Sequence, residues 1–154
     1  MTVHVGRKVP DFTVPVTGGG SWKLADAKGE KLVIYFYPKD MTTGCTRESQ
    51  DFRDLHAAFR KAKVRVLGIS RDSLKRHDKF REKESLPFDL LSDEDEAVCK
   101  IFDVIKEKSL YGRKYMGIDR STFLIDATGV LRREWRSVKV PGHVEEVLEA
   151  AKSL

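Results

Sequence analysis

The sequence predicts an α/β fold, with a central mixed β-sheet flanked by helices and an N-terminal β-hairpin. Three observations lead to this class. The segment Lys31–Tyr37 is apolar on both faces, as is typical of a central strand in a sheet covered by helices. An amphipathic stretch and a second apolar strand, Val64–Ile69, follow it and make a βαβ unit. The chain has 154 residues and no linker or repeat, so residues 1–154 are expected to form a single domain.

The first elements are expected to be the hairpin and the central strand. Residues 12–14 and 21–24 flank a glycine-rich stretch, 18–21, which is typical of a hairpin turn. The central strand follows and ends at Pro38, because proline has no N–H for the ladder. A loop is expected over 39–44.

A helix is expected from about Cys45 to Lys61, since Phe52, Leu55 and Phe59 recur at helical spacing. The strand at 64–69 comes next. A right-handed crossover should place it parallel to the central strand.

A second helix should begin at Asp72 or Ser73, since either can cap it, and end near Glu84. Pro87 then separates this helix from a short strand, Phe88–Leu91.

A third helix is expected to start at Ser92 and Asp93. Residues 106–117 are basic and contain two glycines, which predicts a loop. The apolar face of the third helix is expected to consist of Val98, Ile101, Phe102 and Ile105.

The last part of the chain predicts a second hairpin and a final helix. Residues 121–125 and 130–135 are expected to be strands on either side of the turn signal at 126–129. The helix should span about Val144–Lys152. This order of elements resembles the thioredoxin architecture.

Composition excludes several classes of protein. There are 29 Lys and Arg against 24 Asp and Glu, giving a net charge of +5, but basic and acidic residues are interspersed. This mixing indicates a solvated surface and disfavours nucleic-acid binding. No apolar run approaches ~20 residues, so no membrane span is expected. The first residues lack a secretory signal and two cysteines make no disulfide framework, which favours a cytoplasmic location.

The segment between the central strand and the first helix contains the residues best suited to chemistry. Cys45 is expected in the first turn of a helix, where unpaired N–H groups and the helix dipole favour the nucleophilic thiolate. Thr42 can direct its hydroxyl toward the sulfur or toward an oxygen bound there. Gly44 lets the backbone approach closely. The alternative interpretation is that Cys45 is a small buried hydrophobic residue.

The histidines give weaker signals. His56 and His77 are expected at solvated helix positions, and His143 is expected to help cap the last helix. Tyr111 and Tyr115, in the basic loop, are candidates for the border of the active site.

At this point the sequence resembles a known family. Phe36–Asp40 and Thr42–Glu48 are similar to the active-site segment of the peroxiredoxins, and most similar to the bacterioferritin comigratory protein, or peroxiredoxin Q, group. The family pattern Pro-x-x-x-Thr-x-x-Cys is met by Pro38, Thr42 and Cys45. The resemblance continues through Arg120–Asp126 and covers nearly the whole chain.

The resemblance implies roles for five residues. Cys45 matches the peroxidatic cysteine, and Arg120 matches an arginine that stabilises the thiolate and binds the peroxide oxygens. Thr42 matches the hydroxyl that positions the peroxide. Glu48 matches an acid that orients the arginine, and Pro38 shapes the strand end.

The resemblance also implies a function and its partners. The expected activity is thiol-dependent reduction of hydrogen peroxide and organic hydroperoxides through a cysteine sulfenic acid, which protects the cell against oxidative stress. No metal or organic cofactor is implied, because sulfur supplies the electrons. The expected partners are the hydroperoxide and an external thiol reductant, which is thioredoxin, glutaredoxin or a small thiol. A monomer or weak dimer is expected.

Two departures from the family pattern concern the mechanism. Thr43 stands where the family usually has proline, so weaker geometry or altered substrate preference is expected. Gln50 and Arg81 stand where members of this group keep a resolving cysteine. Cys99 is then either a partly buried helix residue or a resolving cysteine that needs local unfolding. We favour recycling by an external thiol.

A rival hypothesis is a non-catalytic redox-sensing or interaction module that uses the same fold. A thiol–disulfide oxidoreductase is disfavoured, because the chain has no Cys-x-x-Cys motif.

Overall fold

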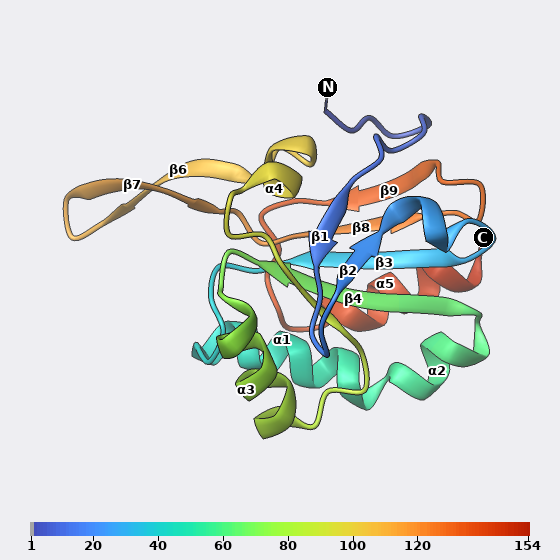
Figure 1. The fold of residues 1–154 in the computed structure, drawn as a ribbon, viewed down its shortest axis with the longest axis horizontal. Helices are drawn as coiled ribbons and strands as arrows, with labels where there is room; N and C mark the ends of the chain where they lie inside the picture. Colours follow the sequence, from blue (N-terminus) through green and yellow to red (C-terminus); the bar gives the residue numbers. More distant parts are fainter. Residues whose placement is uncertain (1) are drawn as a thin grey trace.

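The computed structural model describes residues 2–154, and its centre is a mixed sheet of five strands in the order β5-β4-β3-β8-β9 (Figure 1). β3 pairs in parallel with β4 and antiparallel with β8. The mixed sheet confirms the predicted fold class. The strands are β3 Lys31–Phe36, β4 Val64–Ser70, β5 Leu90–Ser92, β8 Ser121–Ile125 and β9 Leu131–Trp135.

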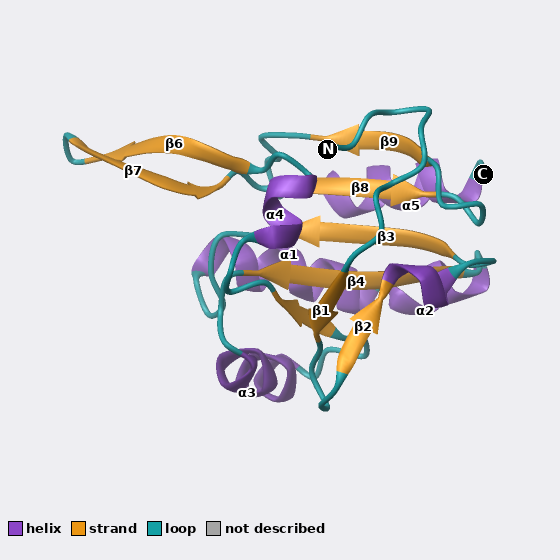
Figure 2. Ribbon diagram, turned by 45° about the horizontal axis from the view of Figure 1, so that its top comes forward, coloured by secondary structure: helices purple, strands orange, loops and turns teal. Residues whose placement is uncertain are grey.

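Most of the helices cover one face of this sheet, and the N-terminal hairpin covers the other (Figure 2). Alternate residues of β3 point to the two faces, as strand geometry requires. Ile34 and Phe36 belong to the core that includes the hairpin and α4, whereas Val33 and Tyr35 belong to the core beneath the other helices. The helices are α1 Thr43–Asp54, α2 His56–Lys61, α3 Leu74–Glu84, α4 Ala97–Ile101 and α5 His143–Lys152.

The N-terminal hairpin is confirmed: β1 (Thr13–Pro15) pairs antiparallel with β2 (Ser21–Lys23), and a short 3-10 turn, Leu24–Ala27, follows. The cap of α3 is also confirmed, because the Ser73 hydroxyl accepts a hydrogen bond from the Arg76 N–H at 3.3 Å. Strands β8 and β9 pair antiparallel as expected.

The single helix expected over 45–61 is wrong in two respects. It starts earlier, at Thr43, and Leu55 divides it into α1 and α2. Leu55 has the non-helical angles φ −100° and ψ 6°. Its N–H still donates to Asp51, and its carbonyl still accepts from Phe59, so the interruption is a local bend. The bend keeps Phe52 and Phe59 in the same core.

The loop expected over 106–117 is also wrong. These residues form an antiparallel hairpin of β6 (Ile105–Leu110) and β7 (Arg113–Ile118). Its two turn residues, Tyr111 and Gly112, have φ values of 50° and 78°, which a tight two-residue hairpin turn requires. The third helix is correspondingly shorter than expected, because Asp103 adopts φ 53° after it and Ile105 enters β6.

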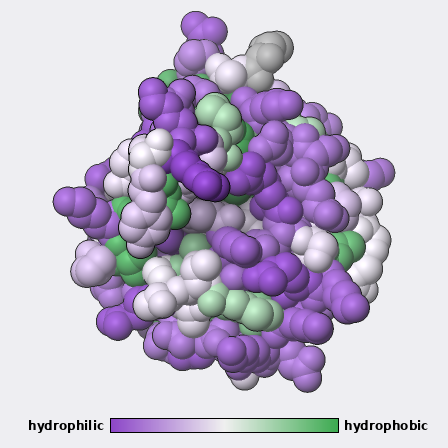
Figure 3. Space-filling model, turned by 90° about the vertical axis from the view of Figure 1, so that its left-hand side faces the viewer, coloured by the Kyte–Doolittle hydropathy of each residue, from purple (hydrophilic) through white to green (hydrophobic). Residues whose placement is uncertain are grey.

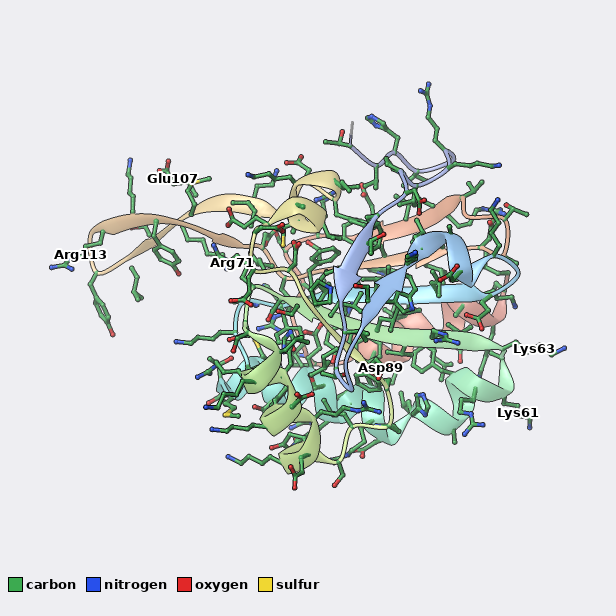
Figure 4. All side chains as sticks on the ribbon, in the orientation of Figure 1. Lys61, Lys63, Arg71, Asp89, Glu107 and Arg113 are labelled. Carbon is green, nitrogen blue, oxygen red and sulfur yellow. The ribbon has the colours of Figure 1, made fainter. Side chains whose placement is uncertain are left out.

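The β6–β7 hairpin projects from the body of the molecule (Figure 1). Arg113 lies at its tip, while Arg71 lies near its base (Figure 4). The Arg71 guanidinium contacts the Glu96 carboxylate at 2.9 Å and the Met116 carbonyl at 3.4 Å. These contacts connect the base of the hairpin to the loops that follow β4 and β5.

Candidate active site

Cys45 lies in the first turn of α1, close behind the carboxyl end of β3. Thr42 is the N-cap residue of this helix. Only 1% of the Cys45 surface is exposed. The first turn of a helix carries unpaired N–H groups and the positive end of the helix dipole, which are favourable surroundings for an anion. Burial agrees with the alternative interpretation of Cys45 as a core residue, so the neighbours of the sulfur decide what it can do.

The register of the sheet brings Arg120 to Cys45. β8 runs antiparallel to β3 with Ser121 opposite Phe36, so Arg120, the residue before β8, lies at the carboxyl end of β3. Its NH2 group donates a hydrogen bond to Cys45 Sγ at 3.3 Å. A Cβ at Gly44 would lie 3.2 Å from the same nitrogen, so the glycine leaves room for the guanidinium.

Glu48 holds the other side of the guanidinium. It lies on the same helix as Cys45 and is fully buried, and its Oε1 accepts a hydrogen bond from Arg120 NH1 at 2.7 Å. Burial raises the pKa of Glu48 to about 7, although the Arg120 charge opposes the rise. Burial disfavours charge on Arg120, but Glu48 and Cys45 outweigh it and raise the Arg120 pKa. Arg120 is therefore a fixed cation directed at the sulfur.

Thr42 and Pro38 lie beside this trio without contacting the sulfur by any hydrogen bond that the structure records. The Thr42 hydroxyl is exposed and donates to the Lys39 carbonyl at 2.9 Å. At the end of β3, the Tyr37 N–H still donates a backbone hydrogen bond to the Ile69 carbonyl, and Pro38 is the next residue. The structure thus brings Cys45, Arg120 and Glu48 together and places Thr42 and Pro38 in the adjoining loop.

A buried group in that loop was missed by the sequence analysis. His77 is completely buried, so the prediction that it is solvated is wrong. Its Nδ1 lies 2.6 Å from Asp40 Oδ2 and its Nε2 lies 2.9 Å from the Leu91 carbonyl. The signal was present, because His77 and Phe80 are spaced by one helical turn and share the buried face of α3.

The other two helix histidines also differ from expectation. His143 does not cap α5: it is 5% exposed, and its Nε2 lies 2.8 Å from the Thr122 hydroxyl. Burial lowers the pKa of His143 to about 4, so its ring is neutral at pH 7. His56 is half-buried against Phe88 rather than solvated, and burial lowers its pKa too.

Cys99 and Cys45 lie on opposite faces of the central sheet. Cys99 belongs to the core that includes the N-terminal hairpin, and Cys45 belongs to the core beneath α1. Both are free thiols. Burial raises the pKa of Cys99, and the neighbouring Asp93 carboxylate adds to the rise. Cys99 is therefore an unreactive core residue in this conformation.

The surface beside Cys45 is open. Met41, Thr42, Thr43 and Thr46 line a shallow depression next to the first turn of α1. Figure 3 views the end of the molecule from which the hairpin projects, and this face is mostly hydrophilic with scattered hydrophobic residues. Tyr111 is 97% exposed at the hairpin tip, so the structure does not place it at the border of the site.

Comparison with known proteins shows the family of the chain. The AhpC/TSA family matches residues 5–134. The peroxiredoxin Bcp of Bacillus subtilis is 49% identical over 154 residues, covering 100% of this chain and 98% of its own. The Escherichia coli K12 peroxiredoxin Bcp is 44% identical over 146 residues, covering 95% and 94%.

Solved structures show the same relationship. Peroxiredoxin Q of Xanthomonas campestris has 50% identity and a TM-score of 0.88, over 92% of this chain and 90% of that one. A cysteine-to-serine mutant of the Xylella fastidiosa PrxQ has 43% identity and a TM-score of 0.93, over 99% and 98%.

The chain belongs to the AhpC/TSA family, within the Bcp, or peroxiredoxin Q, group of peroxiredoxins. It is a thiol-dependent peroxidase, an oxidoreductase that acts on a peroxide with a thiol reductant. No helix among residues 2–154 is long and apolar enough to cross a membrane.

Proposed function

We propose that Cys45 is the residue that attacks the peroxide and that Arg120 and Glu48 prepare it for attack. The observation that carries this proposal is the hydrogen bond from Arg120 NH2 to Cys45 Sγ at 3.3 Å. Glu48 holds the same guanidinium at 2.7 Å, so the cation meets the sulfur without having to reorganise.

The reaction transfers one oxygen atom. The Cys45 thiolate attacks the terminal oxygen of a hydroperoxide, a sulfur–oxygen bond forms, and the O–O bond breaks. Cys45 becomes a sulfenic acid, and the leaving alkoxide or hydroxide takes a proton from solvent to give an alcohol or water. Negative charge moves from sulfur to the leaving oxygen during this step. Arg120 can follow it, because its planar fork presents several donors.

Thr42 positions the peroxide by accepting a hydrogen bond. Its hydroxyl hydrogen is already directed at the Lys39 carbonyl. The oxygen can therefore make a further hydrogen bond only as an acceptor, for example from the O–H of a hydroperoxide. Pro38 ends the strand so that the loop can turn toward α1.

An external thiol completes the cycle. The sulfenic acid reacts with one thiol to form a mixed disulfide and release water. A second thiol then attacks the mixed disulfide, which releases the Cys45 thiol and joins the two reductant thiols in a disulfide. We propose thioredoxin, glutaredoxin or a small thiol as the donor. The position of Cys99 on the opposite face of the sheet supports an external donor over Cys99.

Three further properties are part of this proposal. Organic hydroperoxides are included among the substrates, because the Xanthomonas campestris relative is described by its alkyl peroxide reduction activity. A cytoplasmic location suits a thiol that must stay reduced. The proposal also includes a single domain that is a monomer or weak dimer, and the exposed large hydrophobic residues, most of which lie on the β6–β7 hairpin, offer a small apolar surface for weak self-association.

Peroxide consumption with excess reductant tests the proposal. Cys45→Ser should show no turnover while keeping the wild-type circular dichroism spectrum, because a serine hydroxyl is scarcely ionised at neutral pH. Cys99→Ser is the matched control and should turn over normally. Sustained turnover by folded Cys45→Ser would exclude Cys45 as the attacking residue.

A further inference from the structure

The polar groups of Asp40, in the loop before α1, are held by residues 72–77, at and just before the start of α3, and by Tyr37. The Asp40 N–H donates to Asp72 Oδ2 at 2.8 Å, and the Asp40 carbonyl accepts from Arg76 NH2 at 3.0 Å. Its Oδ1 accepts from the Tyr37 hydroxyl at 2.6 Å, and its Oδ2 lies 2.6 Å from His77 Nδ1. Both side chains of the Asp40–His77 pair are 0% exposed.

The imidazole of His77 is itself fixed at both nitrogens. Its Nε2 lies 2.9 Å from the Leu91 carbonyl, which can only accept, so Nε2 carries a hydrogen. Its Nδ1 lies 2.6 Å from Asp40 Oδ2. The ring therefore links the carboxylate of Asp40 to the backbone of β5.

These contacts reach the Thr42 hydroxyl through one peptide plane. The Asp40 N–H and the Lys39 carbonyl belong to the same peptide unit, which is planar, so fixing one direction fixes the other. Asp72 fixes the N–H at 2.8 Å, and the opposite carbonyl accepts the Thr42 hydroxyl at 2.9 Å. The orientation of that hydroxyl thus depends on Asp72, which lies just before α3.

The next residue shows that the loop is held in a costly conformation. Met41 has φ 65°, in the left-handed region that non-glycine residues seldom adopt. Such a conformation persists when its surroundings determine it. Here the two peptide units on either side of Asp40 are fixed, one by the bond from the Asp40 N–H to Asp72 and the other by the bond from Arg76 to the Asp40 carbonyl.

We propose that His77, Asp72 and Arg76 are positioning residues for the peroxidase reaction, which act through Asp40 to orient the Thr42 hydroxyl so that its oxygen faces the peroxide. The proposal rests on the role given to Thr42 above. None of the three touches the sulfur by a hydrogen bond that the structure records. Their removal should therefore slow the reaction with peroxide and leave simple thiol reactions unchanged.

A matched pair of variants separates positioning from stability. The amide nitrogen of His77→Asn replaces Nδ1 and keeps the contact with Asp40, whereas that of His77→Gln replaces Nε2 and keeps only the contact with Leu91. The test compares the rate constants of Cys45 with hydrogen peroxide and with iodoacetamide. Alkylation by iodoacetamide needs the thiolate but no positioned peroxide. His77→Gln should react with peroxide about tenfold more slowly and with iodoacetamide normally, because small misplacements have large kinetic costs. His77→Asn should restore most of the peroxide rate.

Arg76→Ala is a second variant that is expected to fold, because the Arg76 side chain is 42% exposed. It frees the Asp40 carbonyl and should lower the peroxide rate about threefold. Lys79→Ala, at an exposed position on the same helix, is the control.

Equal peroxide rates in the two His77 variants, or a wild-type rate in both His77→Gln and Arg76→Ala, would overturn the proposal. A crystal structure of His77→Gln tests the proposal independently of activity. If His77→Gln does not fold, the structure of Arg76→Ala serves instead. The contact between Thr42 Oγ1 and the Lys39 carbonyl should be lost, and its persistence would also overturn the proposal. A wild-type protein whose Cys45 does not react with peroxide would instead contradict the proposed function.

Discussion

Glu48 and Arg120 form an ion pair, 2.7 Å long, in which the carboxylate is completely buried. Among residues 2–154, Glu48 Oε2 has no hydrogen-bond partner. The protein therefore keeps a carboxylate in a place where ionisation is unfavourable, and the guanidinium beside Cys45 compensates only part of the cost.

This pair predicts a pH-dependent stability. Burial raises the Glu48 pKa from 4.5 to about 7, so between these values the folded protein holds a proton that the unfolded chain has lost. Stability should fall as the pH rises through this window, by up to about 3 kcal/mol. Urea denaturation at pH 5 and pH 8 measures the fall. Glu48→Gln should reduce it by that amount, and an unchanged fall in Glu48→Gln would contradict the assignment.

Replacing Arg120 should slow the attack on peroxide. Arg120→Lys keeps a positive charge but cannot contact Cys45 and Glu48 together with a planar fork. We expect the rate constant of Cys45 with hydrogen peroxide to fall roughly 10²-fold, the cost of losing one preorganised donor. Stopped-flow measurement checks this, with Arg133→Lys as the control because Arg133 is an exposed arginine of β9. A rate within twofold of the wild type would remove Arg120 from the reaction.

Cys99→Ser should leave recycling intact. The central sheet separates Cys99 from Cys45, so a disulfide would require both cores to open. Turnover with thioredoxin or dithiothreitol should therefore match the wild type. Oxidised wild-type protein that loses two hydrogens per chain, with no such loss in Cys99→Ser, would identify Cys99 as the resolving cysteine.

Thr43→Pro should stabilise the protein. Thr43 is the first residue of α1, where a missing N–H costs nothing. Thr42 already has φ −86° and ψ 157°, the extended conformation that precedes proline. We expect a gain of about 0.5–1 kcal/mol, chiefly from a less flexible unfolded chain. Urea denaturation measures it, and a loss of stability would show that the loop needs the freedom of threonine.

Much of this fold follows from local patterns. The central strands are buried on both faces, and their apolar runs were recognised for that reason. The β6–β7 hairpin could not be recognised in this way, because most of its side chains face solvent and its few apolar residues do not alternate with polar ones. Its one signal was Tyr111–Gly112, a two-residue turn whose first residue is an unusual choice for positive φ.

Some residues of the candidate site could likewise be predicted from the sequence, and others could not. Cys45, Thr42 and Glu48 lie close together in the sequence, and the family resemblance added Arg120 from a distant strand. His77 was misplaced, because a histidine among charged residues suggests solvent. Its partner Asp40 lies 37 residues away, so only the packing of α3 against the loop joins them.

The most direct test of the account is the reaction of the reduced protein with one equivalent of hydrogen peroxide, followed by a sulfenic-acid trap and peptide mass spectrometry. The account predicts one trapped oxidation per chain, on Cys45, with Cys99 unmodified, and no trapped product in Cys45→Ser. Oxidation on Cys99, or reaction of Cys45 no faster than that of a free thiol in solution, would contradict it.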